Sequence, residues 1–505
     1  MRRIGIDVGG TNTDAALLDG TQMVASIKTP TTSDVLTGIR NALQALPHDR
    51  VDAVVVGTTH FTNAVVQRRD LNRVGFLRVG LPAGRGLPPL VDWPQDLAAA
   101  VDGVSILVKG GIEYDGRPFE PLDEDAIVNA AERFRAEGLD ALVVTGSFSP
   151  VDPSQETRAA AILTELLPNA HVTCSHRLGR LGLLERENAA GLNACLVHLA
   201  RDTIAAFAAA LTDANFDADT RLYLTQNDGT LLSLDEAMQH PVLTFASGPT
   251  NSMRGAALLG DVPDGLVVDV GGTTADFGAL VNGYPRQANA AVEVGGVRTL
   301  FQLPDLISIG LGGGSVVRTD PLRIGPDSVG ALLPERARSF GGDMYTLTDA
   351  AIAAARLAIE GTVWPDAPFA TEVLELAGQL IADGADRMKL TAADTPLIAV
   401  GGGAFAVPDH VPGVSTVVRP EHAGVANAVG AALAEVSGEV DRVFDGMNRD
   451  EAVAEAIRLA TESAVASGAL STTIEPIEIE DLPLAYLPGN ARRVRVRVIG
   501  QLDAS

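Results

Sequence analysis

Short apolar runs alternate with helical patterns along the first third of the chain. The apolar runs predict strands at Arg3–Val8, Val24–Ile27, Ala53–Val56, Val74–Val79, Val104–Val108 and Ala141–Val144. Apolar positions with helical spacing predict helices at Ser33–Leu46, Asp123–Glu137 and Pro153–Leu167, with Ser33 and Asp123 as N-caps. Strands that alternate with helices are typical of a largely parallel sheet covered by helices.

The rest of the chain carries longer helical patterns. One long helix is predicted from Leu183 to about Leu211, and we expect it to cross between two lobes. A strand at Arg221–Thr225 is expected to open the second lobe. Further predicted elements are helices at Thr348–Ile359, Ala370–Lys389, Glu421–Ala434 and Arg449–Ala466, and an edge hairpin of Thr472–Ile477 with Arg493–Val498. The expected division is a first lobe at 1–177, a second at 178–440, and a C-terminal extension at 441–505 that packs on the lobes.

One phrase occurs twice in the sequence. Ile4–Asp14 reads IGIDVGGTNTD, and Leu266–Asp276 reads LVVDVGGTTAD. Each copy is an apolar strand, an Asp, two glycines, a threonine and a second Asp, which is the layout of a β-hairpin that binds phosphate. Two copies predict two facing lobes with a nucleotide between them, whereas an ordinary hairpin turn is the alternative for either copy alone.

The residue types of the first copy suit a phosphate chain. Gly9 and Gly10 have no Cβ, so backbone N–H groups can approach an anion closely. Thr11 and Thr13 offer hydroxyl donors, and Asn12 belongs to the same predicted loop. The second copy supplies the corresponding residues Gly271, Gly272, Thr273 and Thr274.

The first acidic residue of each copy predicts a cation. Phosphate repels a carboxylate unless a cation lies between them, so Asp7 and Asp269 predict Mg²⁺, held directly or through water. Asp14 and Asp276 are expected to brace the hairpins by accepting backbone N–H bonds. Direct contact of this second pair with metal or substrate is the alternative.

A third glycine cluster follows a buried strand. The segment Pro396–Phe405 reads PLIAVGGGAF and places Gly401, Gly402 and Gly403 after the apolar run. A backbone without side chains can form a flat slot for adenine; a plain turn from strand to helix is the alternative. Other nucleotide motifs are absent from the sequence, which has no Gly-x-x-x-x-Gly-Lys-Ser/Thr loop and no Gly-x-Gly-x-x-Gly after the first strand.

Two further segments contain candidate substrate contacts. Thr58 and Thr59 lie between a buried strand and a helix, where a helix N-terminus favours an anion or a carbonyl oxygen, unless Thr59 only caps the helix. Asn63 follows one turn later. Gly313 and Gly314 end another apolar strand and are expected to approach substrate or phosphate, with a structural turn as the alternative.

A few other polar side chains are candidates for substrate or metal contacts. Glu187 and Asn188 lie on the predicted long helix, either as substrate contacts or facing solvent. His171, Cys174 and His176 are close enough in sequence to ligate a metal. The chain has no His-x-His pair, no His-Glu-x-x-His and no serine-hydrolase elbow, which disfavours a metal-dependent amidohydrolase barrel and a serine hydrolase.

Several motifs together resemble the hydantoinase A/5-oxoprolinase family. They are VGTTHFTNAVVQRR at Val56–Arg69, LGRLGLLERENAAGLNA at Leu178–Ala194, TQNDG at Thr225–Gly229, ASGP at Ala246–Pro249, ISIGLGGGS at Ile307–Ser315, GPDS at Gly325–Ser328 and TDA at Thr348–Ala350. The resemblance runs to about residue 435. It implies an α/β, two-lobed actin-like or sugar-kinase-like ATPase fold, built from duplicated ribonuclease-H-like domains with a nucleotide cleft between the lobes.

The resemblance also implies a function. Members of this family open cyclic amides with ATP and Mg²⁺ by phosphorylating the carbonyl oxygen, and Asp7 and Asp269 would orient the metal and the nucleophile. We therefore expect an ATP-dependent hydrolase, or one subunit of it, acting on a hydantoin or a 5-oxoproline-like lactam beside a second, hydantoinase B-like subunit. A small-molecule kinase, the ATP-binding subunit of a related carboxylase and a non-catalytic ATP-binding switch are the alternatives.

Two departures separate this chain from the family pattern. Asn12 stands where the family usually has Phe, and the tail after about residue 440 does not resemble the longer members. The chain therefore resembles a shorter branch, whose cyclic amide need not be hydantoin or 5-oxoproline.

The composition of the chain disfavours several classes of binding partner and several kinds of structure. The net charge of −26 disfavours binding to nucleic acid or to an anionic membrane. Cys174 and Cys195 are the only cysteines, so no disulfide framework is expected. No apolar run reaches about 18 residues, so we expect no membrane span. A strand begins near the first residue, so we expect no signal peptide and a cytoplasmic location. We also expect a homo- or hetero-oligomer. Because aromatic residues make up only 4% of the chain, packing is expected to rely on small residues.

Overall fold

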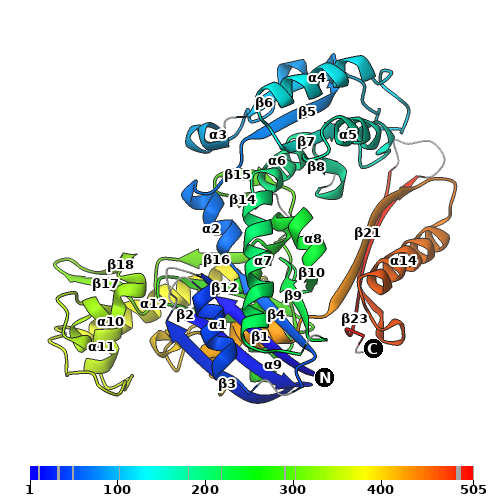
Figure 1. Cartoon of the computed structure of the whole chain (residues 1–505). Helices are drawn as coiled ribbons and strands as arrows, with labels where there is room; N and C mark the ends of the chain where they lie inside the picture. The colour runs from blue at the N-terminus through cyan, green and yellow to red at the C-terminus, as the bar shows by residue number, and fades with distance from the viewer. Residues whose placement is uncertain are drawn as a thin grey trace.

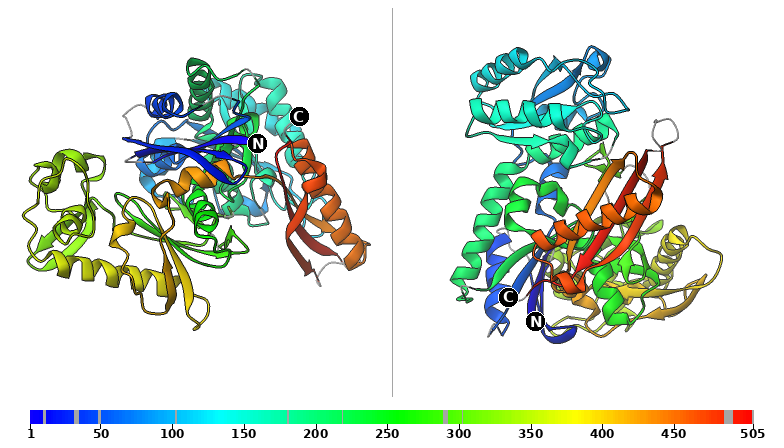
Figure 2. Two further views of the ribbon diagram at one scale, coloured as in Figure 1. Left: turned by 90° about the horizontal axis from the view of Figure 1, so that it is seen from below. Right: turned by 90° about the vertical axis from the view of Figure 1, so that its right-hand side faces the viewer.

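The computed structural model describes residues 1–9, 12–30, 35–47, 50–101, 103–179, 181–217, 219–288, 292–301, 303–484 and 491–503. Figure 1 shows a central body in blue and green, an upper layer in cyan, a second lobe in yellow, and a C-terminal unit in orange and red. The views from below and from the side show the same parts around the central body (Figure 2). Ser33, which we expected as an N-cap, lies outside the described residues.

The first sheet has six strands in the order β10-β9-β4-β1-β2-β3. They are β1 (Arg2–Val8), β2 (Asn12–Asp19), β3 (Gln22–Pro30), β4 (Ala53–Thr58), β9 (Arg221–Thr225) and β10 (Leu231–Ser233). β1 pairs antiparallel with β2 and parallel with β4, and β9 continues the sheet beside β4. The expected opening of a second lobe at β9 is therefore wrong, and a boundary at residue 177 does not follow the sheets, because β9 pairs with β4 inside the first sheet.

The second sheet repeats the central arrangement of the first. Its strands are β11 (Gly265–Val270), β12 (Ala275–Val281), β13 (Tyr284–Pro285), β16 (Leu306–Ile309), β19 (Thr395–Val400) and β20 (Val414–Val418). β11 pairs antiparallel with β12 and parallel with β19, as β1 does with β2 and β4. The helix α12 (Ala370–Met388) packs on this sheet through Val373, Ala377 and Ile381. A smaller hairpin, formed by β17 (Ser315–Thr319) and β18 (Leu322–Ser328), lies beside α12.

A separate parallel sheet forms the upper layer. Its order is β6-β5-β7-β8, from β5 (Val74–Leu81), β6 (Val104–Lys109), β7 (Ala141–Gly146) and β8 (His171–Cys174). The helices α3 (Gln95–Val101), α4 (Glu124–Ala136) and α5 (Ser154–Leu166) belong to this layer (Figure 1). The predicted strands of the first 175 residues thus form two sheets instead of one.

The predicted long helix after Leu183 is two helices. α6 (Leu183–Ala194) and α7 (Val197–Asp213) meet at a bend of 50°. α6 packs on the upper sheet, while α7 packs on α1 (Val35–Ala45) and α8 (Leu234–Gln239), so the pair joins the upper layer to the first lobe and does not cross between lobes. In the described part of the chain, no helix is by itself long and apolar enough to span a membrane; α6 and α7 pass that test only as a bent pair.

Two other helices connect the lobes. α9 (Ser247–Gly260) contacts β4 of the first sheet and both β11 and β19 of the second, and α13 (Ala426–Ala432) packs on β1, β2 and α9. A Cβ on Gly255 would lie 1.8 Å from the Ala426 carbonyl oxygen, and one on Gly430 would lie 1.8 Å from that of Asn251. Glycine at both positions lets the two helices cross at a distance that any side chain would prevent.

Three predicted elements near the C-terminus change in extent. The helix expected at Thr348–Ile359 is α11 (Leu347–Ala353), and the one expected at Glu421–Ala434 is a 3-10 turn followed by α13. Arg493–Val498 belongs to β23 (Arg492–Gly500), which pairs antiparallel with the edge strand β22 (Glu475–Pro483), so the expected hairpin forms. A third strand, β21 (Val436–Phe444), pairs on the other side of β23 and makes β23 the central strand. Its arginines are accommodated because neighbouring carboxylates pair with them, as Glu439 does with Arg495 at 2.7 Å.

The C-terminal unit packs through alanine. α14 (Arg449–Ala466) covers one face of its sheet with a fully buried stripe of Ala452, Ala456, Ala460 and Ala464. The same core reaches Ala53 and Val55 of β4. This confirms the expected packing of small residues, since alanine at every fourth position lets the helix lie close to the sheet.

Candidate functional site

The two hairpin turns have the same hydrogen bond and the same register. The Gly9 N–H donates to the Asn12 carbonyl at 3.0 Å, and the Gly271 N–H donates to the Thr274 carbonyl at 2.9 Å. Asp7 lies opposite Asp14, just as Asp269 lies opposite Asp276. Gly10 and Thr11, which we expected to bind phosphate, lie outside the described residues.

Each first Asp packs against a glycine of the neighbouring parallel strand. A Cβ on Gly57, at the end of β4, would lie 2.8 Å from Asp7 Oδ1. A Cβ on Gly401, just after β19, would lie 2.2 Å from Asp269 Oδ1, and Gly401 has a φ of +87°. The two carboxylates therefore occupy matched sites, which we call cradles: Asp7 against Gly57, and Asp269 against Gly401. Gly401, the first glycine of the third cluster, is required at its position by both the available space and the backbone conformation.

The helix α9 brings the two cradles together. A Cβ on Gly248 would lie 3.6 Å from Asp7 Oδ1, and the Ser252 hydroxyl donates a short hydrogen bond to Asp269 Oδ2. Four residues of helix rise about 6 Å, so the two carboxylates lie beside positions of α9 that are about one turn apart on the same face. The charge of Asp269 contributes to raising the pKa of Asp7, which also places the two groups near each other.

Asn427 and Lys28 complete the first cradle. The Asn427 amide donates to Asp7 Oδ2 at 2.9 Å and to Asp14 Oδ2 at 3.1 Å, while Lys28 Nζ lies 2.5 Å from Asp14 Oδ1. Within the described residues, side-chain donors therefore brace Asp14, and the expected backbone N–H bonds stay a prediction because the turn at residues 10 and 11 is outside that part of the chain. Sequence reasoning missed Asn427; its one signal is an amide at the start of an alanine- and valine-rich helix.

The second pair of acids is also perturbed. Burial raises the pKa of Asp276 to about 6, although hydrogen bonds from Ser308 and Thr274 oppose the shift.

Asp7 has the properties of a cation ligand. It is 5% exposed, and among the described residues its Oδ1 atom has no hydrogen-bond partner. Burial, followed by the charges of Asp14 and Asp269, raises its pKa to about 7. A divalent cation between the hairpins would offset this repulsion and satisfy the unpaired oxygen, so the residues present fit Mg²⁺.

Thr13 is fully buried, and its side chain faces the core with Ala15 and Leu17 because strand side chains alternate between faces. Its counterpart in the second hairpin is Ala275, also fully buried. The Thr13 hydroxyl has no hydrogen-bond partner among the described residues, and its contact with phosphate stays a prediction. Asn12 and Thr274 are half-buried at the turns, and Thr273 is exposed.

The other glycines divide into supporting and open positions. Gly313 and Gly314 donate backbone hydrogen bonds to the carbonyls of Gly271 and Gly272 at 3.0 and 2.8 Å, so they support the second hairpin turn from behind. Gly403 donates to the Val270 carbonyl at 2.7 Å. Gly402 differs, since no described atom lies within 4 Å of a Cβ added to it, and it is the member of the third cluster that can border a ligand.

The Thr58–Asn63 segment joins the first cradle to α9. The Thr58 hydroxyl accepts from the His60 N–H at 3.1 Å and begins α2 (His60–Gln67), while its carbonyl accepts from the Ser247 hydroxyl at 3.3 Å. Thr59 occupies the N-cap position without a side-chain cap bond, and its hydroxyl accepts from the exposed Asn63 amide at 3.2 Å. The side chain of Thr59 packs near Gly248, so this threonine lies beside Asp7.

Glu187 and Asn188 are buried in the upper layer. Glu187 is 1% exposed and accepts from Arg78 Nε at 2.8 Å. Asn188 is 2% exposed, accepts from the Trp93 indole at 2.8 Å and donates to the Arg298 carbonyl at 3.0 Å. Neither solvent exposure nor an open substrate contact fits these positions, because their partners in the fold occupy both side chains.

Replacing Glu187 is expected to destabilise the chain. Glu187→Ala leaves the fully buried Arg78 without its counter-charge, so we expect a loss of about 3–5 kcal/mol in unfolding free energy. Glu185→Ala is the matched control on the same helix, since its partner Arg298 is 53% exposed and such a pair is worth roughly 0–1 kcal/mol. Denaturant unfolding of both variants measures the difference; equal midpoints would contradict the assignment.

Two family models match successive regions of this chain. A family described as hydantoinase/oxoprolinase N-terminal region matches residues 3–167, and one described as hydantoinase/oxoprolinase matches residues 186–395. The caprolactamase subunit alpha of Pseudomonas jessenii is 27% identical over 394 residues, which are 70% of this chain and 55% of that protein. The acetophenone carboxylase gamma subunit of Aromatoleum aromaticum is 28% identical over 397 residues, 69% of this chain and 52% of that protein. The chain thus spans a little over half the length of these curated relatives.

Among solved structures, the ATP-dependent caprolactamase from Pseudomonas jessenii superposes with a TM-score of 0.76 and 20% identity, covering 99% of this chain and 88% of that one. This likeness and the repeated sheets confirm the expected α/β, two-lobed actin-like fold. The chain belongs to the hydantoinase/oxoprolinase family.

Proposed function

We propose that this chain binds Mg²⁺-ATP between its two hairpins and is the ATP-using subunit of a hydrolase that opens a cyclic amide. The observation that carries the proposal is the pair of matched carboxylates: Asp7 and Asp269, from two different sheets, lie beside Gly248 and Ser252 on one helix, α9. Such a pair can hold one cation from both sides and position a phosphate chain between the lobes.

The residues around the cradles have separate roles in this proposal. The Gly9–Asn12 and Gly271–Thr274 turns approach the phosphates with backbone N–H groups. The N-terminus of α9 beside Thr59 adds a favourable site for an anion. Asn427 holds Asp7 in place, and Gly402 borders the adenine. Mg²⁺, held by Asp7 and Asp269 directly or through water, would neutralise charge on the phosphates.

The reaction follows from amide chemistry. An unactivated lactam is a poor electrophile because its nitrogen donates into the carbonyl. Transfer of the γ-phosphoryl group to the carbonyl oxygen makes the carbonyl carbon a strong electrophile, and water adds to it. The ring nitrogen then takes up a proton and leaves, which opens the ring to an acyl phosphate, and a second water hydrolyses this to a carboxylate and free phosphate. The chain's own contribution is to position the groups and to stabilise charge.

A partner subunit is part of the proposal. Both named relatives are subunits, and this chain spans 55% and 52% of their lengths. We therefore propose a second, hydantoinase B-like chain that completes the ring-opening site. The carboxylase subunit among the relatives supports a second candidate, an ATP-using carboxylase, which would need bicarbonate as a co-substrate.

Phosphate release separates these candidates. With caprolactam, hydantoin and 5-oxoproline as a panel, we expect one ring to stimulate ATP hydrolysis by at least about tenfold when the partner is present, with one phosphate and one opened ring per turnover. Chromatography with mass detection measures the products. A stable phosphorylated product would establish a kinase, and strict dependence on bicarbonate would establish a carboxylase. Full ring opening by the isolated chain would refute the partner requirement.

A further inference from the structure

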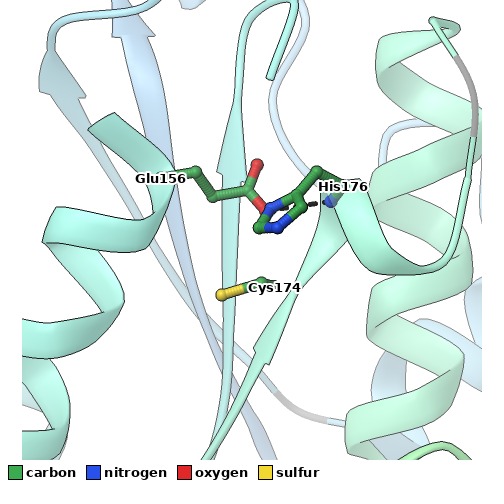
Figure 3. A group of neighbouring side chains, drawn as sticks. All are labelled: Glu156, Cys174 and His176. Atoms are coloured by element: carbon green, nitrogen blue, oxygen red, sulfur yellow. Dashed lines mark hydrogen bonds and ion pairs between the residues drawn. The ribbon is translucent and has the colours of Figure 1, made fainter. Parts of the chain in front are cut away.

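A group of metal-binding side chains lies in the upper layer, apart from the hairpins. Glu156, Cys174 and His176 each offer a ligand atom, and these atoms lie within 4.8 Å of one another. They come from α5, the end of β8 and the 3-10 turn at Ser175–Arg177. Figure 3 shows the imidazole of His176 between the Glu156 carboxylate and Cys174.

Glu156 orients this group and is not itself available as a ligand. Its Oε1 accepts from the N–H and the Nδ1 of His176, both at 2.9 Å. Its Oε2 accepts from the Gly146 N–H at 2.8 Å and the Ser175 hydroxyl at 3.0 Å. Four donors fill the lone pairs of an ionised carboxylate. The bond to Nδ1 leaves Nε2 of His176 as the ligand atom, which is the carboxylate–histidine arrangement of protein metal sites.

A second histidine is oriented in the same way. Glu236 Oε1 lies 2.7 Å from Nδ1 of His240, which again leaves Nε2. His240, His171, Cys174 and His176 all line one cavity of about 210 Å³. This cavity therefore gathers one sulfur and three imidazole donors from two parts of the chain, residues 171–176 and residue 240.

We propose that this cavity is a Zn²⁺ site with Cys174 and His176 as its first ligands, His240 and His171 as the further donors, and Glu156 and Glu236 as the carboxylates that orient the histidines. A set of one thiolate and three imidazoles is a composition that favours Zn²⁺ over Mg²⁺ or Ca²⁺. The site is separate from the ATP cradles and would exist whether or not the proposed function holds.

The metal displaces the thiol proton of Cys174 to solvent as the sulfur–metal bond forms. Arg177 on the cavity wall opposes a cation, whereas the two carboxylates favour it.

The position of the cavity suggests what the metal does. β8 belongs to the upper layer, while His240 follows α8 in the first lobe. Asn193 already links these parts by donating to the Thr173 hydroxyl at 3.1 Å and to the Gln239 carbonyl at 2.8 Å. A metal held from both sides would fix the upper layer on the first lobe and stabilise the fold by mass action.

Metal titration of the full, untagged chain tests the proposal. After chelation and dialysis, Zn²⁺ is expected to bind with a stoichiometry of one and to raise the melting temperature. Co²⁺ in its place should give the near-ultraviolet thiolate-to-cobalt charge-transfer band. Cys174→Ser should remove that band, and His176→Ala should lower the affinity by at least about 100-fold.

Matched variants separate this site from general effects. Cys195→Ala removes the other cysteine, which is fully buried elsewhere, and His198→Ala removes a nearby half-exposed histidine; both should bind Zn²⁺ like the parent. Because Glu156→Gln can fail to fold, Glu236→Gln serves as the test of orientation, and a roughly 10-fold to 100-fold loss of affinity is expected. Absence of binding by the parent chain, or unchanged binding after Cys174→Ser and His176→Ala, would overturn the proposal.

Discussion

Asp7→Asn is expected to abolish ATP turnover while making the metal-free chain more stable at about pH 8. The carboxylate is lost as a cation ligand, and removal of a group that stabilises transition-state charge typically costs roughly 100-fold to 1,000-fold in turnover. Asn has the same shape as Asp and can still accept from Asn427, so the cradle should persist.

The gain in stability follows from the pKa of Asp7. Burial and the charges of Asp14 and Asp269 raise it from 3.8 to about 7. A carboxyl group whose pKa is higher in the folded chain than in the unfolded chain stabilises the fold while it is protonated, that is, below its pKa in the unfolded chain. This stabilisation is lost as the pH rises through its pKa in the folded chain. Above pH 7 the charged Asp7 therefore destabilises the metal-free chain, and a neutral Asn should recover roughly 2–4 kcal/mol. At about pH 4 the gain should vanish, because Asp7 is then neutral in the parent.

Melting temperature against pH, measured with and without Mg²⁺, checks this prediction together with phosphate release. Mg²⁺ should stabilise the parent and not the variant. Asp19→Asn is the control, since Asp19 lies at the far end of the same hairpin and its side chain is 57% exposed. Unchanged turnover in Asp7→Asn would remove the proposed mechanism, and lower stability at about pH 8 would contradict the repulsion between the carboxylates.

Gly401→Ala is expected to damage the second cradle. The added methyl group would lie 2.2 Å from Asp269 Oδ1 and 2.4 Å from the Val270 carbonyl oxygen. The φ of +87° adds roughly 1–3 kcal/mol of backbone strain for any residue with a Cβ. The turn cannot easily move aside, because the Gly401 N–H donates to the Ala423 carbonyl at 2.9 Å. A shift of the Asp269 carboxylate by about 1 Å would lower turnover by roughly 100-fold.

Gly402→Ala is the matched control for the fold. No described atom lies within 4 Å of its added methyl group, so the melting temperature should stay near that of the parent. If Gly402 borders the adenine, its variant should raise KM for ATP with little change in kcat. Equal melting temperatures and equal kcat values for the two variants would show that Gly401 does not hold Asp269.

The repeated hairpin was predictable because its information is local. Asp and Gly-Gly at fixed positions set the turn, and strand alternation sets which side chains share a face. The sequence therefore predicted two matched hairpins, and the structure contains both, with Asp7 opposite Asp14 and Asp269 opposite Asp276. The alanine stripe of α14 was predictable for the same reason, since its period is that of a single helix.

Errors arose where a side chain's surroundings come from distant segments. Glu187 looks solvent-facing on its own helix, yet Arg78 from β5 neutralises it in the core. β9 looks like the start of a new lobe, yet it pairs with β4. Cys174, His176 and His240 share a cavity only because the upper layer rests on the first lobe.

By itself, the sequence determined the two hairpins, the glycine turns and the family, because each depends on residues adjacent in the chain. Only the tertiary structure decided that Asp7 and Asp269 lie beside Gly248 and Ser252 of the same helix α9, and that Asn427, 420 residues from Asp7, holds its carboxylate. The physical reason is that helix crossing sets these contacts: α9 and α13 approach closely at Gly255 and Gly430, and local propensity carries no information about which helix will lie opposite.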